Sequence, residues 1–305
     1  MKRKVIQVGE FTKVVSLPRE WIKKYDVKKG DELFVTEHGS NISIAPNNEE
    51  HVVRGEIDLS GLNKCVDRVL NVYFKGGYDE LKIKYDDPKL FEEIPPSLKK
   101  YMIGFEMIEQ GQNYCVIKSM TKTYSEDFDS ILLRTLLLLN SMSEGIKEAI
   151  ANKDLSTINN IKSLEETNNR YTGFCSRLIN KDALKYGSNK NFMYTIVEEL
   201  EKIADVYKYI CCYLYENPET VKEIDKRTAA LYSVTGELLV DFINLFKSYN
   251  IKRVPQIFQR RKEIISEAND IIKKKSGANA RIAYYLMDIT QMITNITSLK
   301  IGTEI

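Results

Sequence analysis

The chain has 305 residues, of which 43% are hydrophobic and 29% charged, and its net charge at pH 7 is +2. This composition is typical of a folded globular protein and excludes both a disordered chain and a polycation. The length suits two or three domains. Only two histidines are present, His38 and His51, which argues against histidine-based catalysis, zinc sites and ferritin-like di-iron sites.

The apolar runs and the cysteines indicate a cytoplasmic protein that does not insert into a membrane. The two most apolar runs, Ile131–Leu139 and Tyr207–Leu214, are far shorter than the ~20 residues that span a bilayer. The N-terminus is charged and no apolar stretch follows it, so we expect no signal peptide. The five cysteines include no C-x-x-C pair and are interpreted as buried thiols in a reducing compartment. They are Cys65, Cys115, Cys175, Cys211 and Cys212.

Residues 1–48 are rich in strand signals. Pro18 suits the first turn of a short helix, and Gly39 marks the tip of a hairpin. The expected elements are strands from Val5 to Val8 and from Lys13 to Leu17, a helix over Arg19–Tyr25, and strands Glu32–Thr36 and Asn41–Ala45. Residues 46–50 are expected to be a linker.

Residues 49–122 are predicted to form a small α/β connecting domain. Apolar residues recur at helical spacing over Leu62–Tyr73, and Pro95-Pro96 is expected to break the chain. The expected strands are Val52–Leu59, Leu81–Tyr85, Ile103–Ile108 and Tyr114–Lys118, which predict a β-α-β-β-β layer.

Strand signals vanish in residues 123–305, which are predicted to be all helical. The expected helices cover about 126–151, 154–180, 191–215, 219–249, 254–275 and 278–300. They divide into two repeats of three, 126–215 and 219–305, and the short connections favour antiparallel bundles. The fold class is therefore a multidomain α+β protein.

Positive charge is concentrated at the N-terminus. Residues 1–30 contain nine basic and three acidic side chains, a surplus of six charges in a nearly neutral protein. Binding to nucleic-acid phosphates needs such a local patch. A solvated surface on a small domain would also explain it.

The segment from Val5 to Val35, VIQVGEFTKVVSLPREWIKKYDVKKGDELFV, resembles the AbrB/SpoVT/MazE family of swapped-hairpin DNA-binding domains. Leu17–Ile22 matches the start of that family's short helix, and Val27–Leu33 matches the turn that follows. The resemblance implies a homodimer, because two chains of this family interleave their hairpins around a shared core, and about 45 residues cannot bury a sufficient core alone. It assigns Trp21 and Ile22 to that shared core, with base stacking as the alternative.

The same resemblance implies a DNA face made of basic residues in the first strand, the following loop and the short helix. The matching residues are Lys2, Arg3, Lys4, Lys13, Arg19, Lys23 and Lys24. Most of them would contact phosphates, which positions a protein without reading sequence. Lysine lacks the bidentate fork of arginine, so the lysine-rich face predicts weak base selectivity.

Three acidic residues, Glu198, Glu201 and Asp205, share one face of the helix expected at 191–215. Like charges on adjacent turns repel, and a bound cation would reverse that effect. The alternative is a solvated acidic face with Lys202 and Lys208 nearby.

The stretch Val197–Ile210, VEELEKIADVYKYI, resembles the signature of the PhoU family of phosphate-uptake regulators. Further similarity lies in Leu139–Ile150, Asp154-Leu155, Ser163–Glu166 and Cys175–Ile179. The resemblance implies two tandem three-helix bundles that carry E/D-x-x-x-D metal motifs.

The implied metal ligands are Glu201 and Asp205, with Glu198 and Glu165. Oxygen ligands of this kind suit Mg²⁺, Mn²⁺ or iron. In the second repeat, Thr290 and Thr294 stand where the motif has carboxylates, and the acids that remain are Glu263, Glu267, Asp270 and Asp288.

A chain that combines these two segments resembles fusion proteins common in archaea. The combination favours a non-enzymatic DNA-binding transcription regulator linked to phosphate homeostasis. Its helical part would sense a ligand or a partner. One alternative is an adaptor that regulates a phosphate transporter or kinase without binding DNA. Another is an antitoxin, although antitoxins are usually short with a disordered tail. No G-x-G-x-x-G, Walker A, G-x-S-x-G or H-E-x-x-H motif points to an enzyme.

Overall fold

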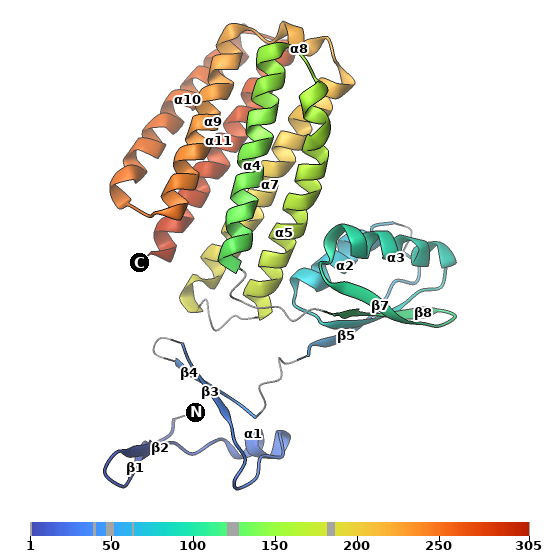
Figure 1. Ribbon diagram of the computed structural model, residues 1–305, viewed down its shortest axis with the longest axis vertical. Coiled ribbons are helices and arrows are strands. Elements are labelled where there is room, and N and C mark those ends of the chain that lie inside the picture. The colour runs from blue at the N-terminus through green and yellow to red at the C-terminus, as the bar shows by residue number, and fades with distance from the viewer. Residues whose placement is uncertain are drawn as a thin grey trace. The chain divides into compact units, whose positions relative to one another are not determined.

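The computed structural model describes residues 2–38, 41–46, 52–62, 64–120, 128–181 and 187–304. Its internal contacts divide the chain into two units, Met1–Val52 and Val53–Ile305. The first is a small strand-rich module, and the second combines an α/β layer with a helical lobe (Figure 1). This confirms the multidomain α+β class. The hairpin tip expected at Gly39, residues 47–50 of the expected linker and the helix start expected at 126 lie outside the described residues.

The N-terminal module contains two short hairpins on either side of one helix. Gly9, at φ +77°, allows the tight turn of the first hairpin. In the second hairpin, Val35 pairs with Ile44 and Thr36 with Ser43. Both hairpins are antiparallel. The elements in order are β1 (Ile6–Val8), β2 (Thr12–Val14), α1 (Arg19–Lys24), β3 (Phe34–His38) and β4 (Asn41–Ala45).

The α/β layer is a four-stranded sheet with two helices on one face. The sheet order is β5-β6-β8-β7, in which β5 and β6 are parallel and the other neighbours antiparallel. The parallel pair is joined through a helix, as a crossover between parallel strands requires. The elements are β5 (Arg54–Asp58), α2 (Val66–Lys75), β6 (Glu80–Lys84), α3 (Pro88–Tyr101), β7 (Phe105–Gln110) and β8 (Tyr114–Ser119).

Helix α3 corrects the expectation that Pro95-Pro96 breaks the chain. The Asp87 carboxylate caps its first turn by accepting from the Lys89 amide at 2.9 Å, and the helix continues through both prolines. Both prolines lie on the exposed side of α3, while Leu90 and Ile94 are buried. Water can therefore satisfy the carbonyls that lose their helical partners. The layer is β-α-β-α-β-β rather than β-α-β-β-β.

The helical lobe consists, within the described residues, of six long helices in two groups of three. In each group a short 3₁₀ segment precedes the middle helix, namely η2 (Ser156–Asn160) and η4 (Ile251–Arg253). The long helices are α4 (Phe128–Asn152), α5 (Ile161–Lys181), α7 (Lys190–Glu216), α9 (Lys226–Lys247), α10 (Val254–Lys274) and α11 (Gly277–Thr303). The two short segments η3 (Gly187–Asn189) and α8 (Thr220–Glu223) lie between them. Helix α4 packs on α9 and α7 packs on α11, so corresponding helices of the two groups meet.

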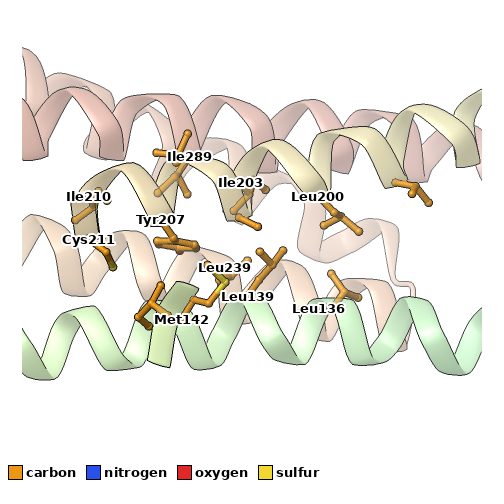
Figure 2. Close-up of a cluster of buried hydrophobic side chains, with 14 of the residues drawn as sticks. Leu136, Leu139, Met142, Leu200, Ile203, Tyr207, Ile210, Cys211, Leu239 and Ile289 are labelled. Atoms are coloured by element: carbon orange, nitrogen blue, oxygen red, sulfur yellow. The ribbon is translucent and has the colours of Figure 1, made fainter. Parts of the chain in front are cut away.

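The core of the lobe lies at the junction of these groups. Figure 2 shows one buried cluster with side chains from both groups, in which Leu139 of α4 and Ile203 of α7 are joined by Leu239 of α9 and Ile289 of α11. Each large apolar side chain buried in this way contributes roughly 1.5–3 kcal/mol. Among the described residues, α9 alone has the length and composition of a membrane span, and half of its apolar window is buried inside the protein.

The α/β layer is attached to the lobe by Arg177 of α5, whose side chain is fully buried. Its guanidinium donates to the carbonyls of Phe74 and Tyr78 and to the Asp79 carboxylate, and lies 5.3 Å from the Phe74 ring centre. Lys181 Nζ lies 2.6 Å from the same Asp79 oxygen. Asp79 also accepts from the Val53 amide at 2.9 Å, so one carboxylate organises the junction.

We expect Arg177→Met to lower the free energy of unfolding by about 3–5 kcal/mol, because it removes the main partner of a buried carboxylate. Urea unfolding followed by far-ultraviolet circular dichroism measures this loss. The control is Arg170→Met, an exposed position on the same helix, where a change within about 0.5 kcal/mol is expected. Equal losses in the two variants would contradict the role given to Arg177.

Candidate functional site

The seven basic residues expected to face DNA are all exposed in the N-terminal module. Lys2, Arg3 and Lys4 precede β1, Lys13 lies at the centre of β2, and the other three are on α1. Among the described residues, none of the seven forms an ion pair with a carboxylate, whereas Lys28 pairs with Asp26 at 3.0 Å. Their charge is therefore available to an external anion.

The turn after α1 holds this face in place. The helix starts with a bond from the Ile22 amide to the Pro18 carbonyl at 3.0 Å. After it ends, the Asp31 carboxylate accepts from the Lys28 amide at 2.6 Å, and Gly30 adopts φ +98°. A side chain at Gly30 would be strained, so glycine is required there. Trp21 and Ile22 are half-buried, and the Trp21 ring packs against Tyr25 at 5.3 Å.

The module has no interior of its own. No described side chain of residues 2–46 is buried, although the segment is rich in valine and isoleucine. Phe11 is 92% exposed, Val35 61% and Ile42 66%. The other large apolar residues left exposed are Val5, Ile6, Val8, Val14, Val15, Phe34 and Ile44. A surface this apolar implies a protein partner that covers it.

The four expected metal ligands form two separate pairs, and each pair holds a lysine. Lys75 Nζ of α2 lies 3.0 Å from the Glu198 carboxylate and 2.8 Å from that of Glu201. Lys208 Nζ lies 2.7 Å from Glu165 and 2.5 Å from Asp205. Glu201 and Asp205, expected to act together, thus face different ammonium groups.

Both lysines are held in the charged form. Burial alone lowers the pKa of Lys75, but attraction and hydrogen bonds from Glu201 and Glu198 outweigh it, so its pKa lies above the usual value. The pKa of Lys208 is also raised, because the bonds from Asp205 and Glu165 outweigh the desolvation. Among the described residues, no three histidine, cysteine, aspartate or glutamate side chains gather closely enough to hold a metal ion.

In the second repeat, two of the remaining acidic residues also face a positive group from another helix. Thr290 and Thr294 are buried and donate to the carbonyls of Leu286 and Thr290, one turn earlier. Of the remaining acids, Glu267 and Asp270 both pair with Arg227, at 2.7 Å for Asp270. Glu263 accepts from Gln259 at 2.9 Å, and burial raises the pKa of Asp288.

The cysteines differ in part from the expectation that all five are buried. Cys65 and Cys212 are exposed, while Cys115, Cys175 and Cys211 are buried. Cys212 follows Cys211 on α7 and is turned by about 100° toward solvent. Burial raises the pKa of Cys115 to about 11 and that of Cys211 to about 12, so both thiols stay protonated at neutral pH.

Sequence reasoning named one lysine partner of the acidic residues, Lys208, and missed the other, Lys75. Lys208 stands near Asp205 in the sequence, but Lys75 lies more than a hundred residues before Glu198. Arg177 is another cation whose partner is distant in sequence, since its carboxylate partner is Asp79. No local pattern marks such pairs, because they form only when helices from distant segments pack together.

Residues 12–50 match a family of bacterial antitoxins, described as antidote-toxin recognition MazE. The matched segment runs from β2 through β4 and includes Lys13, Arg19, Lys23 and Lys24. Lys2, Arg3 and Lys4 precede it, and the α/β layer and the helical lobe lie outside it. No curated protein and no solved structure matches the chain.

Proposed function

We propose that this protein is a homodimeric, cytoplasmic DNA-binding transcription regulator rather than an enzyme. The observation that carries the proposal is the N-terminal module, which combines a MazE-type sequence with seven exposed basic side chains. The same module lacks an interior, which supports a dimer built by pairing two copies of it. Phosphate contacts from lysine would position the dimer on DNA with little reading of bases.

The helical lobe would act in this regulator as a sensor or partner-binding module, and the link to phosphate homeostasis rests on the likeness of Val197–Ile210 to the PhoU signature. Two groups of three helices, with α4 on α9 and α7 on α11, are compatible with that likeness. A partner from phosphate transport or signalling is the corresponding expectation.

Toxin neutralisation is a second candidate function, which the description of the matching family favours. The two candidates differ in what the purified protein does. A regulator binds duplex DNA as a homodimer, whereas a protein that acts only on a toxin, or only as an adaptor, has no DNA affinity that depends on the basic face.

We expect four charge-removing substitutions on the basic face to weaken binding to mixed-sequence duplex DNA and to flatten its salt dependence. The variant carries glutamine at Lys13, Arg19, Lys23 and Lys24. Each phosphate contact adds roughly 0.9 to the slope of log affinity against log salt, so the slope should fall by about 3 to 4. Fluorescence anisotropy over a salt series measures both effects.

The matched control changes the net charge by the same amount on the helical lobe. It carries glutamine at the exposed residues Lys202, Lys222, Lys247 and Lys262. Its affinity and salt slope should remain those of the unchanged protein. An equal loss in both variants, or no binding by the unchanged protein at low salt, would refute the DNA proposal.

We expect Val35→Asp to convert the dimer into a monomer, because it places a charge in the surface that the partner module covers. Sedimentation velocity measures the change in mass. The control is Val72→Asp on α2, where the valine is 68% exposed and should leave the dimer intact. A monomeric unchanged protein, or a Val35→Asp protein that stays dimeric, speaks against the proposed assembly.

A further inference from the structure

Two lysines, Lys75 of α2 and Lys208 of α7, contact the acidic residues of α7 and occupy the positions that a bridging cation would take. Lys208 Nζ joins a carboxylate of α5 to one of α7, through Glu165 and Asp205. Lys75 Nζ joins two carboxylates of α7 to the α/β layer. In both places one positive group lies within 3.0 Å of two negative ones, which removes the repulsion expected between like charges.

These side chains do not fit a hard divalent cation as they stand. Such a cation takes about six or more oxygen ligands and excludes an ammonium group from the same space. Each pair offers two carboxylates, and further hydrogen bonds already engage them. Ser176 Oγ lies 3.1 Å from Glu198, and the Asn169 amide lies 2.8 Å from Glu165.

Burial makes the lysines structurally important. The Glu165 side chain is only 6% exposed and the Lys75 side chain 14%. A buried carboxylate without a cation is strongly unfavourable, so some positive group must accompany Glu165 in the folded state. Lys75 also fixes the end of α2 against α7, next to the bond from Asn180 Nδ2 to the Lys75 carbonyl at 2.9 Å.

We propose that lysines of the same chain, Lys75 of the α/β layer and Lys208 of the helical lobe, serve as counter-ions in place of divalent metal, and that removing Lys208 turns the Glu165–Asp205 pair into a site for a divalent cation. The α7 carboxylates that face Lys75 then serve to dock the α/β layer. The expected E/D-x-x-x-D metal motif is replaced by lysine-bridged pairs, and Arg227 performs the same task for Glu267 and Asp270 in the second repeat.

The test compares thermal unfolding of the full chain in EDTA and in about 1 mM Mn²⁺. The unchanged protein should have the same melting temperature in both. Lys208→Met should melt about 5 °C lower or more in EDTA and recover most of that loss in Mn²⁺. Lys208→Arg keeps the charge, so its melting temperature should be the same in EDTA and in Mn²⁺.

Two further variants keep the test decisive if Lys208→Met does not fold. The double variant Glu165→Gln with Lys208→Met removes both charges, and it should fold in EDTA and show no Mn²⁺ response. Lys75→Met should increase hydrogen exchange in α2. The control is Lys147→Met, whose partner Glu144 has a side chain that is 45% exposed. It should change neither the melting temperature nor the hydrogen exchange of α2.

Two outcomes would overturn the proposal. One is an unchanged protein that Mn²⁺ stabilises, or that retains stoichiometric metal after dialysis against EDTA. The other is a folded Lys208→Met protein that melts like the unchanged protein, or that is destabilised and does not respond to Mn²⁺. Neither result depends on whether the protein binds DNA.

Discussion

Arg177 is a fully buried cation at the boundary between the α/β layer and the helical lobe. A buried guanidinium is tolerated only when its hydrogen bonds are made and its charge is matched. Here the carbonyls of Phe74 and Tyr78 accept from the guanidinium, the Asp79 carboxylate matches its charge, and the rings of Phe74 and Phe105 flank it. The layer and the lobe therefore form one unit, because separating them would leave Asp79 and Arg177 without each other.

The N-terminal module shows the opposite arrangement. Its large apolar side chains are mostly exposed, and the seven basic residues expected to face DNA have no carboxylate partner among the described residues. The proposed partners would account for both features, because a second module would cover the apolar side chains and a polyanion would match the charges. In the helical lobe, by contrast, lysine or arginine from the same chain neutralises the acidic pairs. The pairing of charges thus separates a surface suited to binding from surfaces that stabilise the fold.

Long-range pairing also explains why acidic residues are a weak indicator of metal sites. Glu198, Glu201 and Asp205 lie on adjacent turns, and from spacing alone a cation is one way to relieve their repulsion. The structure relieves the repulsion with two ammonium groups, and one of them, Lys75 of α2, is revealed by no spacing rule. A metal site and a lysine-bridged pair therefore have the same local sequence pattern, and only the tertiary neighbours separate them.

The sequence by itself determined the classes and approximate limits of the elements. Apolar periodicity and turn residues predicted the helices of the lobe and the hairpins of the module, because these signals are local. Pro95-Pro96 misled the prediction, because the cost of proline in a helix depends on which side faces water. Tertiary structure alone decided which charges are neutralised, which cysteines are buried and how the layer joins the lobe. The neutralised charges and the junction depend on pairs such as Arg177–Asp79 and Lys75–Glu201, whose members are distant in sequence and meet only when the segments that carry them pack together.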